Sequence, residues 1–465
     1  MCECCNSLPI LCNKKSLKRA YFGFIKNDYK SINMHYPKLK KGISTSKYFI
    51  LFILFGCLLT SSCVHENKPM KIVSEDTMVQ DFYAKNDSNQ FWFSSNKNMK
   101  RANEWLDAID STNNFGLVSD KIKIKQARLV LKENNKNDNE LIEATDQQIT
   151  GLVLHFIKEL QEGFVHFDFD EVRIPRDSVY AAQLLNSKHS ESVSDLITRL
   201  DSKDQDYAVL KKFLNDSISV DDTLKYKTIQ LAMNYRRYLT LNEHSDYIIA
   251  NIPETEVRYY QNNQLELKMK SVVGKKKNPT PTIASYITDI VTFPFWNVPF
   301  SIASKELLPK VQKDESYLER NNFEVVDGKG NVMDDSDLDW ETYTETSFPY
   351  FFRESTGPNN SLGVLKFNLQ NPFSIYLHDT NLKGAFAKDY RFLSHGCVRL
   401  EKPIELASLL AKGKIDEQAI KSGKADTESK TIVLDQKIPV FIIYVPVTVD
   451  GQKVTFLKDV YGLVQ

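Results

Sequence analysis

Cysteine is nearly absent from most of this 465-residue chain, and Cys397 is the only cysteine after residue 63. An intramolecular disulfide needs two thiols, so the sequence excludes a disulfide scaffold for the body of the protein. A lone thiol is either an inert, buried hydrophobe or a reactive group, and the cysteine count leaves both interpretations open. The other cysteines are confined to the N-terminal segment: Cys2, Cys4, Cys5, Cys12, Cys57 and Cys63.

An excess of charge of either sign is also lacking. The chain has 60 basic and 60 acidic residues and a pI near 7.1. A nucleic-acid-binding protein needs a strongly basic face, so we do not expect nucleic acid as a partner. No internal repeat or low-complexity tract stands out. The length exceeds what one hydrophobic core supports, which predicts at least two domains.

The most apolar run, Tyr48–Leu59, spans 12 residues. A transmembrane helix needs about 20 such residues. Lysines precede the run, and Thr60, two serines and Cys63 follow it, which is the order of a secretory signal. The segment resembles a bacterial lipoprotein signal, which implies lipidation of Cys63 and a membrane anchor. At the third position before Cys63, Thr60 stands where such signals prefer leucine. Cys57 is a weaker candidate for lipidation, and an uncleaved N-terminal anchor is the alternative to a cleaved signal.

We therefore assign residues 1–63 to a signal region and expect the body to lie on the periplasmic side of a bacterial envelope. Residues 1–33 fit poorly in front of such a signal, so we expect the true start at Met34. Val64 directly after Cys63 favours the outer membrane by the usual sorting preference. A metal site built from the four cysteines before Met34 is disfavoured, because no Cys or His follows at finger-like spacing.

The rest of the chain divides by pattern into an α+β protein. Residues 64–90 are polar and are predicted to form a tether. Residues 91–240 carry apolar positions at helical spacing and predict an all-α scaffold domain, with His155 as a core histidine. Residues 247–465 show short β-type runs broken by Pro and Gly, which predict a mainly β domain. A charged helical stretch interrupts that domain after residue 301.

Two β-type segments in the second domain carry chemical groups. In the segment PFSIYLH, strand alternation places Phe373, Ile375 and Leu377 on one face and Ser374, Tyr376 and His378 on the other. In CVRL, alternation buries Val398 and Leu400 and projects Cys397 and Arg399 together. If the two strands are neighbours, His378 and Cys397 come within reach of one another.

This pairing suits nucleophilic catalysis. A free thiol is only a few per cent ionised at neutral pH, and a nearby histidine can remove its proton and form a thiolate–imidazolium pair. Arg399 would favour the thiolate, and the N–H of Gly396 or Cys397 could form an oxyanion hole. No histidine follows Cys397, which excludes the papain-like order of cysteine before histidine. The base must then be His378 or His395.

These residues closely resemble a known family. HDT followed by SHGCVRL, with 18 residues between His378 and Cys397, is similar to the signature of the YkuD-type L,D-transpeptidases. Similarity extends from about Ala232 to the C-terminus and indicates the large, two-domain (YcbB-like) branch. That branch implies a β-sandwich-like catalytic domain at 247–465 with a helical, lid-like insertion at 301–356. Larger relatives in that branch also carry a peptidoglycan-binding domain between the scaffold and the catalytic domain. This chain has almost no room for such a domain between Asp216 and Thr223.

The resemblance also assigns roles to individual residues. It implies that Cys397 is the nucleophile and His378 the general base, with His395 and Gly396 shaping the oxyanion site and Ser394 bracing the loop. For Trp296 and Tyr376 the alternative role is plain packing, and for Arg399 it is a structural hydrogen bond. The residues that would line the donor site are Tyr376, Arg399, Trp296 and Asn371.

The implied reaction transfers an acyl group between peptidoglycan stem peptides. Cys397 would attack a stem tetrapeptide, release D-alanine and pass the acyl group to a neighbouring stem, forming a 3-3 cross-link, or to a protein acceptor. Family members are acylated by carbapenems on the same cysteine, and no metal or organic cofactor is implied. Two alternatives remain: an L,D-carboxypeptidase that uses water as acceptor, and a non-catalytic wall-binding lipoprotein.

Overall fold

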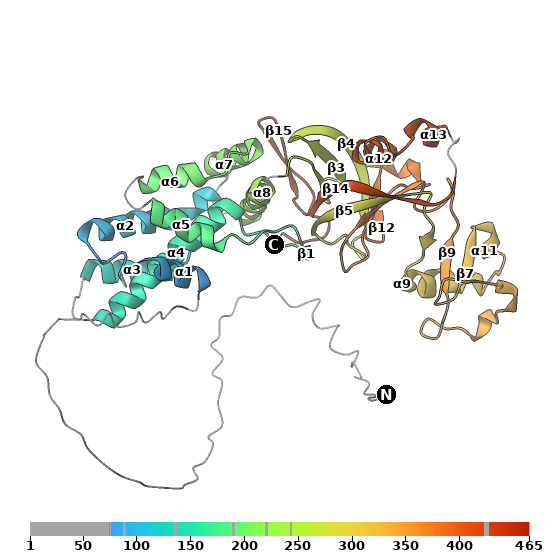
Figure 1. Ribbon diagram of the computed structural model, residues 1–465, viewed down its shortest axis with the longest axis horizontal. Helices are drawn as coiled ribbons and strands as arrows, with labels where there is room; N and C mark the ends of the chain where they lie inside the picture. Colours follow the sequence, from blue (N-terminus) through green and yellow to red (C-terminus); the bar gives the residue numbers. More distant parts are fainter. Residues whose placement is uncertain are drawn as a thin grey trace, which may run out of the picture. The chain divides into compact units, whose positions relative to one another are not determined.

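The computed structural model describes residues 74, 76–86, 90–133, 138–187, 191–218, 222–241, 244–422 and 427–464, all in the unit Pro69–Gln465. The predicted signal region 1–63, its Cys63, the start at Met34 and the first part of the predicted tether lie outside these residues. The described chain passes through a helical domain and then a mainly β domain (Figure 1). The α+β fold class is therefore confirmed.

The N-terminal domain is helical, as its spacing predicts. Side-chain caps start several of its helices: Asp76, Ser95, Asp138 and Asp204 each accept a backbone N–H of the first turn. The largest of its clusters of buried residues includes Trp92, Trp105 and Phe156. Its helices are α1 (Thr77–Lys85), α2 (Asn96–Asp110), η1 (Thr112–Phe115), α3 (Lys121–Glu133), α4 (Asn139–Glu162), α5 (Asp177–Asn186), α6 (Val193–Leu200), α7 (Gln205–Ser217) and α8 (Thr223–Leu241).

The prediction of a tether over 64–90 is wrong for its second half. Helix α1 lies there, and its Met78, Val79, Phe82 and Tyr83 are at most 3% exposed within the helical core. These four residues recur at i, i+1, i+4 and i+5, which is one face of a helix. The polar residues before them conceal this short amphipathic pattern in the sequence.

The helical domain joins the sheet through a strand and a shared core. Strand β1 (Phe169–Asp170) pairs in parallel with β5 (Ile283–Thr292). Helices α7 and α8 supply buried residues to a cluster that also contains residues of the C-terminal strands, such as Phe441. The connection between α7 and α8 is only residues 218–222, which leaves no room for another domain.

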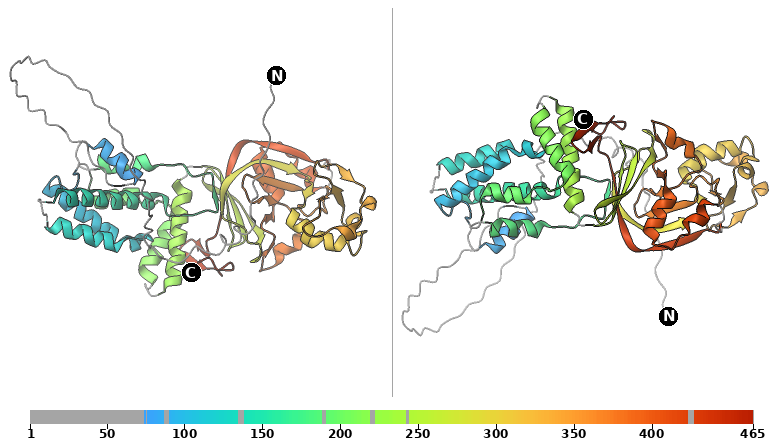
Figure 2. Two further views of the ribbon diagram at one scale, coloured as in Figure 1. Left: turned by 90° about the horizontal axis from the view of Figure 1, so that it is seen from below. Right: turned by 90° about the horizontal axis from the view of Figure 1, so that it is seen from above.

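The second domain is built on one mixed sheet that closes on itself (Figures 1 and 2). The strand order is β1-β5-β10-β11-β13-β4-β3-β2-β14, and β14 pairs again with β5. The strands therefore form a ring rather than the two separate layers of a sandwich. Its strands are β2 (Tyr247–Asn251), β3 (Glu256–Gln261), β4 (Gln264–Gly274), β10 (Leu365–Leu369), β11 (Leu377–His378), β12 (Phe392–Ser394), β13 (Val398–Leu400) and β14 (Lys430–Ile443).

Helix α12 (Pro403–Ala411) packs Leu406, Ala407 and Leu410 into the same core as the strands. Proline at its first turn is compatible with helix initiation, because the first N–H groups have no partner within the helix. The shorter elements of this domain are η5 (Lys383–Ala387), α13 (Glu417–Lys421) and the C-terminal hairpin β15 (Val447–Asp450) and β16 (Lys453–Phe456).

The insertion predicted at 301–356 is present, but it is not simply helical. A four-stranded sheet of order β6-β9-β7-β8 spans it, and its own core contains Trp340, Phe348 and Phe352. The strands of this sheet are too short to give a recognisable β pattern in the sequence. The elements are β6 (Trp296–Asn297), α9 (Phe300–Ile302), η2 (Ala303–Leu307), α10 (Leu308–Val311), α11 (Tyr317–Arg320), β7 (Phe323–Val326), β8 (Val332–Met333), η3 (Asp335–Asp337), η4 (Trp340–Thr342) and β9 (Phe351–Glu354).

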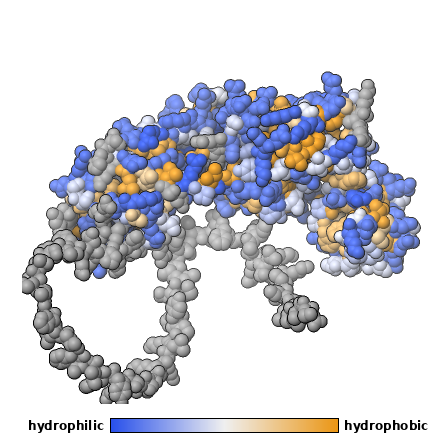
Figure 3. All heavy atoms as spheres, in the orientation of Figure 1, coloured by the Kyte–Doolittle hydropathy of each residue, from blue (hydrophilic) through white to orange (hydrophobic). Residues whose placement is uncertain are grey.

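The face shown in Figure 3 is mainly hydrophilic, with apolar areas between the charged ones. Large apolar side chains are also exposed in and beside the insertion, where Phe295, Phe300 and Phe351 are 41%, 45% and 41% exposed. None of the helices in the described ranges is both long and apolar enough to span a membrane.

Candidate active site

Cys397 lies immediately before β13, at the edge of the core of the closed sheet. Val398 and Leu400 are fully buried, whereas Cys397 and Arg399 are only partly buried. The alternation predicted for CVRL is therefore present. Hydrophobic burial of alternate residues fixes the register of the strand, which in turn fixes the side of the sheet on which the thiol lies.

The loop before Cys397 is held by hydrogen bonds to its own backbone. The Ser394 hydroxyl donates to the Cys397 carbonyl oxygen at 2.6 Å and accepts the Gly396 N–H at 3.1 Å. Thr280 donates its hydroxyl to the Gly396 carbonyl oxygen at 2.7 Å. This geometry suits the bracing role predicted for Ser394.

Gly396 has a structural requirement of its own. Its φ is +125°, and a Cβ placed there would lie 3.0 Å from Ile375 Cδ1. Any larger residue would therefore be strained and crowded. Because its N–H is used by Ser394, Gly396 is not a free donor for an oxyanion. The N–H of Cys397 has no partner within the described part of the chain, and it is the better donor of the two predicted.

His378 is on the strand beside the nucleophile. Strands β11 and β13 are parallel neighbours, and His378 pairs with Arg399 while Leu377 pairs with Val398. The imidazole is 4% exposed, and its Nδ1 has no hydrogen-bond partner in the described residues. Burial, reinforced by the positive charge of Arg399, lowers the pKa of His378 to about 3, so the imidazole is neutral at physiological pH.

Asp379 does not orient this imidazole through its carboxylate. Its carboxylate accepts the Val364 N–H at 3.0 Å and pairs with Lys383. The backbone of Asp379 instead forms a hydrogen bond that acts to raise the pKa of His378.

The Cys397 thiol is also neutral. Burial raises the pKa of Cys397 to about 11, although Tyr376, Lys366 and Arg399 act to lower it. The expected thiolate–imidazolium pair is therefore wrong for the resting site, because burial disfavours both charged forms. Within the described ranges no hydrogen bond links Cys397 to His378, and the thiol instead donates to the Ser374 carbonyl oxygen at 3.8 Å.

The turn at 371–375 explains this contact and corrects the prediction for Asn371. The Asn371 amide donates to the carbonyl oxygens of Leu369 and Ile375, and its Oδ1 accepts the N–H groups of Phe373 and Ile375. The side chain is thus fully used inside its own turn and not available to a donor peptide. Phe373 is 41% exposed in this turn, so its predicted place on the core face is wrong.

Tyr376 and Trp296 are brought to the thiol. Burial is the main cause that raises the pKa of the Tyr376 hydroxyl, and the neighbouring Cys397 and Trp296 also act on it. The Tyr376 and His378 ring centroids are 5.5 Å apart in an edge-to-face arrangement. Trp296 belongs to β6, so the insertion contacts the site at this point.

His395 faces away from the predicted pair. Its Nε2 lies 2.9 Å from Glu306 Oε1 of the insertion and 3.2 Å from Lys275 Nζ. In the described residues no hydrogen bond joins His395 to Cys397 or His378. His395 therefore does not steady the Cys397–His378 pair by a hydrogen bond. It links the loop before Cys397 to the insertion instead.

Lys366 is a site residue that the sequence does not reveal. It lies on β10, opposite His378 in the register with β11, and its Nζ is 4.5 Å from the Tyr376 ring centroid. Burial lowers the pKa of Lys366, and the neighbouring Cys397 acts to raise it. A lysine in the run LKFNL reads as an ordinary solvent-facing strand residue, so only the register reveals its position.

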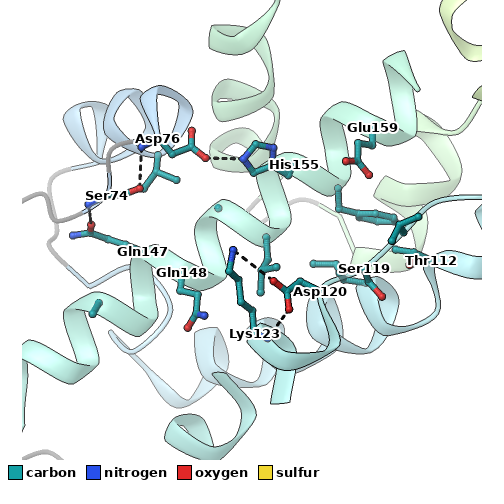
Figure 4. A pocket seen from close by; sticks show the side chains of 17 residues that line it. Ser74, Asp76, Thr112, Ser119, Asp120, Lys123, Gln147, Gln148, His155 and Glu159 are labelled. Atoms are coloured by element: carbon teal, nitrogen blue, oxygen red, sulfur yellow. Dashed lines mark hydrogen bonds and ion pairs between the residues drawn. The ribbon is translucent and has the colours of Figure 1, made fainter. Parts of the chain in front are cut away.

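A pocket of about 490 Å³ in the helical domain offers an alternative site (Figure 4). His155 lies in its wall and is exposed, with Nε2 2.7 Å from Asp76 Oδ2, so its prediction as a core histidine is wrong. Lys123 pairs with Asp120 at 3.6 Å, and the lining residues include no cysteine. This pocket lacks a nucleophile with an adjacent base, unlike the surroundings of Cys397.

Metal-binding residues do not gather in the described part of the chain: no group of three or more His, Cys, Asp or Glu side chains is placed to hold an ion.

Comparisons with known proteins agree with this geometry. Residues 245–431 match the YkuD family, described as the L,D-transpeptidase catalytic domain, and residues 77–214 match the scaffold domain. A Haemophilus influenzae protein that is provisionally named an L,D-transpeptidase is 34% identical over 244 residues, covering 50% of this chain and 48% of that protein. The chain thus spans about half the length of this relative.

Solved structures of similar proteins are more distant. An Enterococcus faecium L,D-transpeptidase is 11% identical, with a TM-score of 0.23, over 44% of this chain and 51% of that one. An L,D-transpeptidase from Mycobacterium smegmatis is 12% identical, with a TM-score of 0.22, over 43% and 58%. The assignment rests on the family matches: the chain belongs to the L,D-transpeptidase family, with a scaffold domain followed by a YkuD-type catalytic domain.

Proposed function

We propose that this protein is a cysteine-dependent peptidoglycan L,D-transpeptidase that forms 3-3 cross-links. The observation that carries the proposal is the position of Cys397, the only cysteine after residue 63, immediately before the strand that pairs with that of the buried His378. A neutral imidazole can accept the thiol proton, which the nucleophile must lose as it attacks.

In the first half-reaction Cys397 Sγ attacks the carbonyl carbon of the third residue of a stem tetrapeptide. A sulfur–carbon bond forms, the amide carbon–nitrogen bond breaks, and the thiol proton passes through His378 to the departing nitrogen of D-alanine. The Cys397 N–H would donate to the oxyanion of the tetrahedral intermediate. Starting from a neutral pair, charge develops only during attack, when these groups can stabilise it.

In the second half-reaction the side-chain amine of a neighbouring stem attacks the thioester. A new amide bond forms, the sulfur–carbon bond breaks, and the amine proton returns to the thiolate through His378. Neither half-reaction requires an oxidant, a reductant or a cofactor.

The proposal is tested by incubating the full-length protein with purified stem tetrapeptides and separating the products by mass. The expected products are free D-alanine and a dimer joined between two third residues, with neither formed by Cys397→Ala. Accumulation of a tripeptide without dimer would instead show an L,D-carboxypeptidase. Absence of any turnover, with the protein folded, would contradict the proposal and favour a wall-binding role.

We also propose that the chain is exported and anchored by a lipid on Cys63, on the periplasmic face of the outer membrane. The order of lysines, apolar run and small residues before Cys63 supports this. Labelling cells with a fatty-acid probe should mark the wild type and spare Cys63→Ser. A label that persists in Cys63→Ser would contradict the anchor, and membrane fractionation would test the leaflet.

A further inference from the structure

Positive charge gathers around Cys397, and neither cation forms an ion pair in the described part of the chain. Lys366 and Arg399 both act on the thiol electrostatically. Arg399 Nε is buried and has no hydrogen-bond partner in the described residues, and no salt bridge to either cation is found there. Asp289 is the carboxylate that acts on Lys366, and it is hydrogen-bonded to Asn368 Nδ2 at 2.5 Å.

Such an arrangement is costly in a protein that has nothing to bind. Cations removed from water lose hydration, and the loss is normally compensated by ion pairs or hydrogen bonds. Here the Tyr376 ring offers Lys366 Nζ a cation–π contact at 4.5 Å. Asp289 acts on Lys366 without forming an ion pair with it, and its Oδ1 accepts a hydrogen bond from Asn368. The missing partner is therefore an anion that arrives with the substrate.

We propose that Lys366 and Arg399 form a carboxylate-binding subsite that holds the free C-terminal carboxylate of the donor peptide. The inference rests on the proposed function and specifies its substrate. In a tetrapeptide the terminal carboxyl carbon is three bonds from the carbonyl carbon under attack, at most about 4 Å away. Cations that flank Cys397 Sγ are thus within reach of this carboxylate when the scissile carbonyl is in place.

The subsite would make the enzyme select chains that end one residue after the attacked bond. A longer peptide carries a neutral amide at that position, which cannot form a charge-assisted hydrogen bond of equal strength. The terminal carboxylate of the correct substrate would also neutralise the two cations, and only while that substrate is bound. Lys366 is the sharper probe, because Arg399 lies only two residues after the nucleophile and its replacement would disturb Cys397 directly.

An alternative role for Lys366 is to lower the pKa of the thiol without contacting substrate. The two roles predict different substrate dependence. Loss of thiol activation slows the reaction of every donor equally, whereas loss of a carboxylate contact slows only donors with a free terminal carboxylate.

The test compares a stem tetrapeptide with its C-terminal carboxamide, using wild type, Lys366→Met and Lys366→Arg. The matched control is Lys268→Met, which removes an exposed lysine on β4 that pairs with Glu256. We expect wild type to favour the acid by about tenfold or more in kcat/KM. Lys366→Met should abolish this preference by slowing the acid alone, and Lys366→Arg should retain it.

Equal rates for the acid and the amide in wild type, or an equal loss for both in Lys366→Met, would overturn the subsite. Calorimetric binding of both peptides to Cys397→Ala separates this result from a failure of the proposed function, because binding needs no turnover. Preferential binding of the acid that disappears in Cys397→Ala/Lys366→Met supports the subsite. Equal affinities for acid and amide would contradict it whatever reaction the enzyme performs.

Discussion

The buried Asp146 of the helical domain and the buried groups beside Cys397 differ in their hydrogen bonding. Asp146 is fully buried in the helical core and accepts the N–H groups of Phe91, Trp92 and Phe93, with the Tyr83 hydroxyl as a further donor. Near Cys397, by contrast, His378 Nδ1 and Arg399 Nε are buried without hydrogen-bond partners among the described residues, as are some atoms of the helical core such as Trp105 Nε1. The Asp146 carboxylate is thus satisfied within the fold, whereas the unpaired atoms beside the nucleophile remain open to a substrate.

This comparison predicts that mutations in the two regions separate stability from chemistry. Removing an acceptor from the Asp146 network should unfold the helical domain more easily and leave the folded enzyme active. Removing a group near Cys397 should slow the reaction at a smaller cost in stability, because His378 Nδ1 and Arg399 Nε have no hydrogen bond to lose among the described residues.

The largest expected effect is on the reaction of His378→Gln. Loss of the general base should slow acylation of Cys397 by a carbapenem about 10²- to 10⁴-fold, measured as the rate of adduct formation by intact mass. His166→Gln, which replaces an exposed histidine of the helical domain, is the control and should react at the wild-type rate. A His378→Gln rate within threefold of wild type would remove this residue from the mechanism.

Asp146→Ala should have the next largest effect, but on stability. Several donors lose their acceptor in the core, so the free energy of unfolding should fall by about 3 kcal/mol or more. Urea denaturation followed by circular dichroism measures this change. Asp81→Ala, which breaks an exposed pair with Lys85 on α1, should cost under about 1 kcal/mol. Equal costs for the two variants would show that the Asp146 network contributes nothing special.

Gly396→Ala should have a smaller effect, concentrated on the reaction. Its φ of +125° and the 3.0 Å approach to Ile375 would displace the nucleophile, at a cost of about 1–3 kcal/mol. We expect roughly tenfold slower acylation. Gly384→Ala is the control, because a Cβ there meets nothing within 4 Å. Wild-type acylation by Gly396→Ala would show that the loop tolerates a side chain.

The smallest expected effect is that of pH. His378 has a pKa of about 3 and the thiol a pKa of about 11, so both stay neutral between them. The acylation rate should therefore change less than about threefold from pH 5.5 to 8.5. A resting thiolate–imidazolium pair would instead give an acylation rate that falls as the pH is lowered, because the thiolate becomes protonated. Stopped-flow fluorescence across this range distinguishes the two states.

The sequence predicted much of this picture because hydrophobic periodicity and motif order are local properties. The alternation around Val398 and Leu400 correctly predicted that Cys397 and Arg399 lie on one side of β13. The position of His378 next to this strand followed from the family pattern and is seen in the register of β11 and β13.

What the sequence could not reveal depends on contacts between distant segments. Lys366 becomes a site residue only through the pairing of β10 with β11. The amide of Asn371 is used by its own turn, and His395 is drawn to Glu306 of the insertion, neither of which is encoded in residue spacing. The neutral state of Cys397 and His378 likewise arises from burial by the folded sheet.

The central claim, that Cys397 is the nucleophile, is tested most directly by the intact mass of the full-length protein after incubation with a carbapenem. Wild type should gain the mass of one carbapenem, His378→Gln should gain it far more slowly, and Cys397→Ala should gain none. A carbapenem adduct that forms on Cys397→Ala would contradict the account, because the nucleophile would then lie elsewhere in the chain.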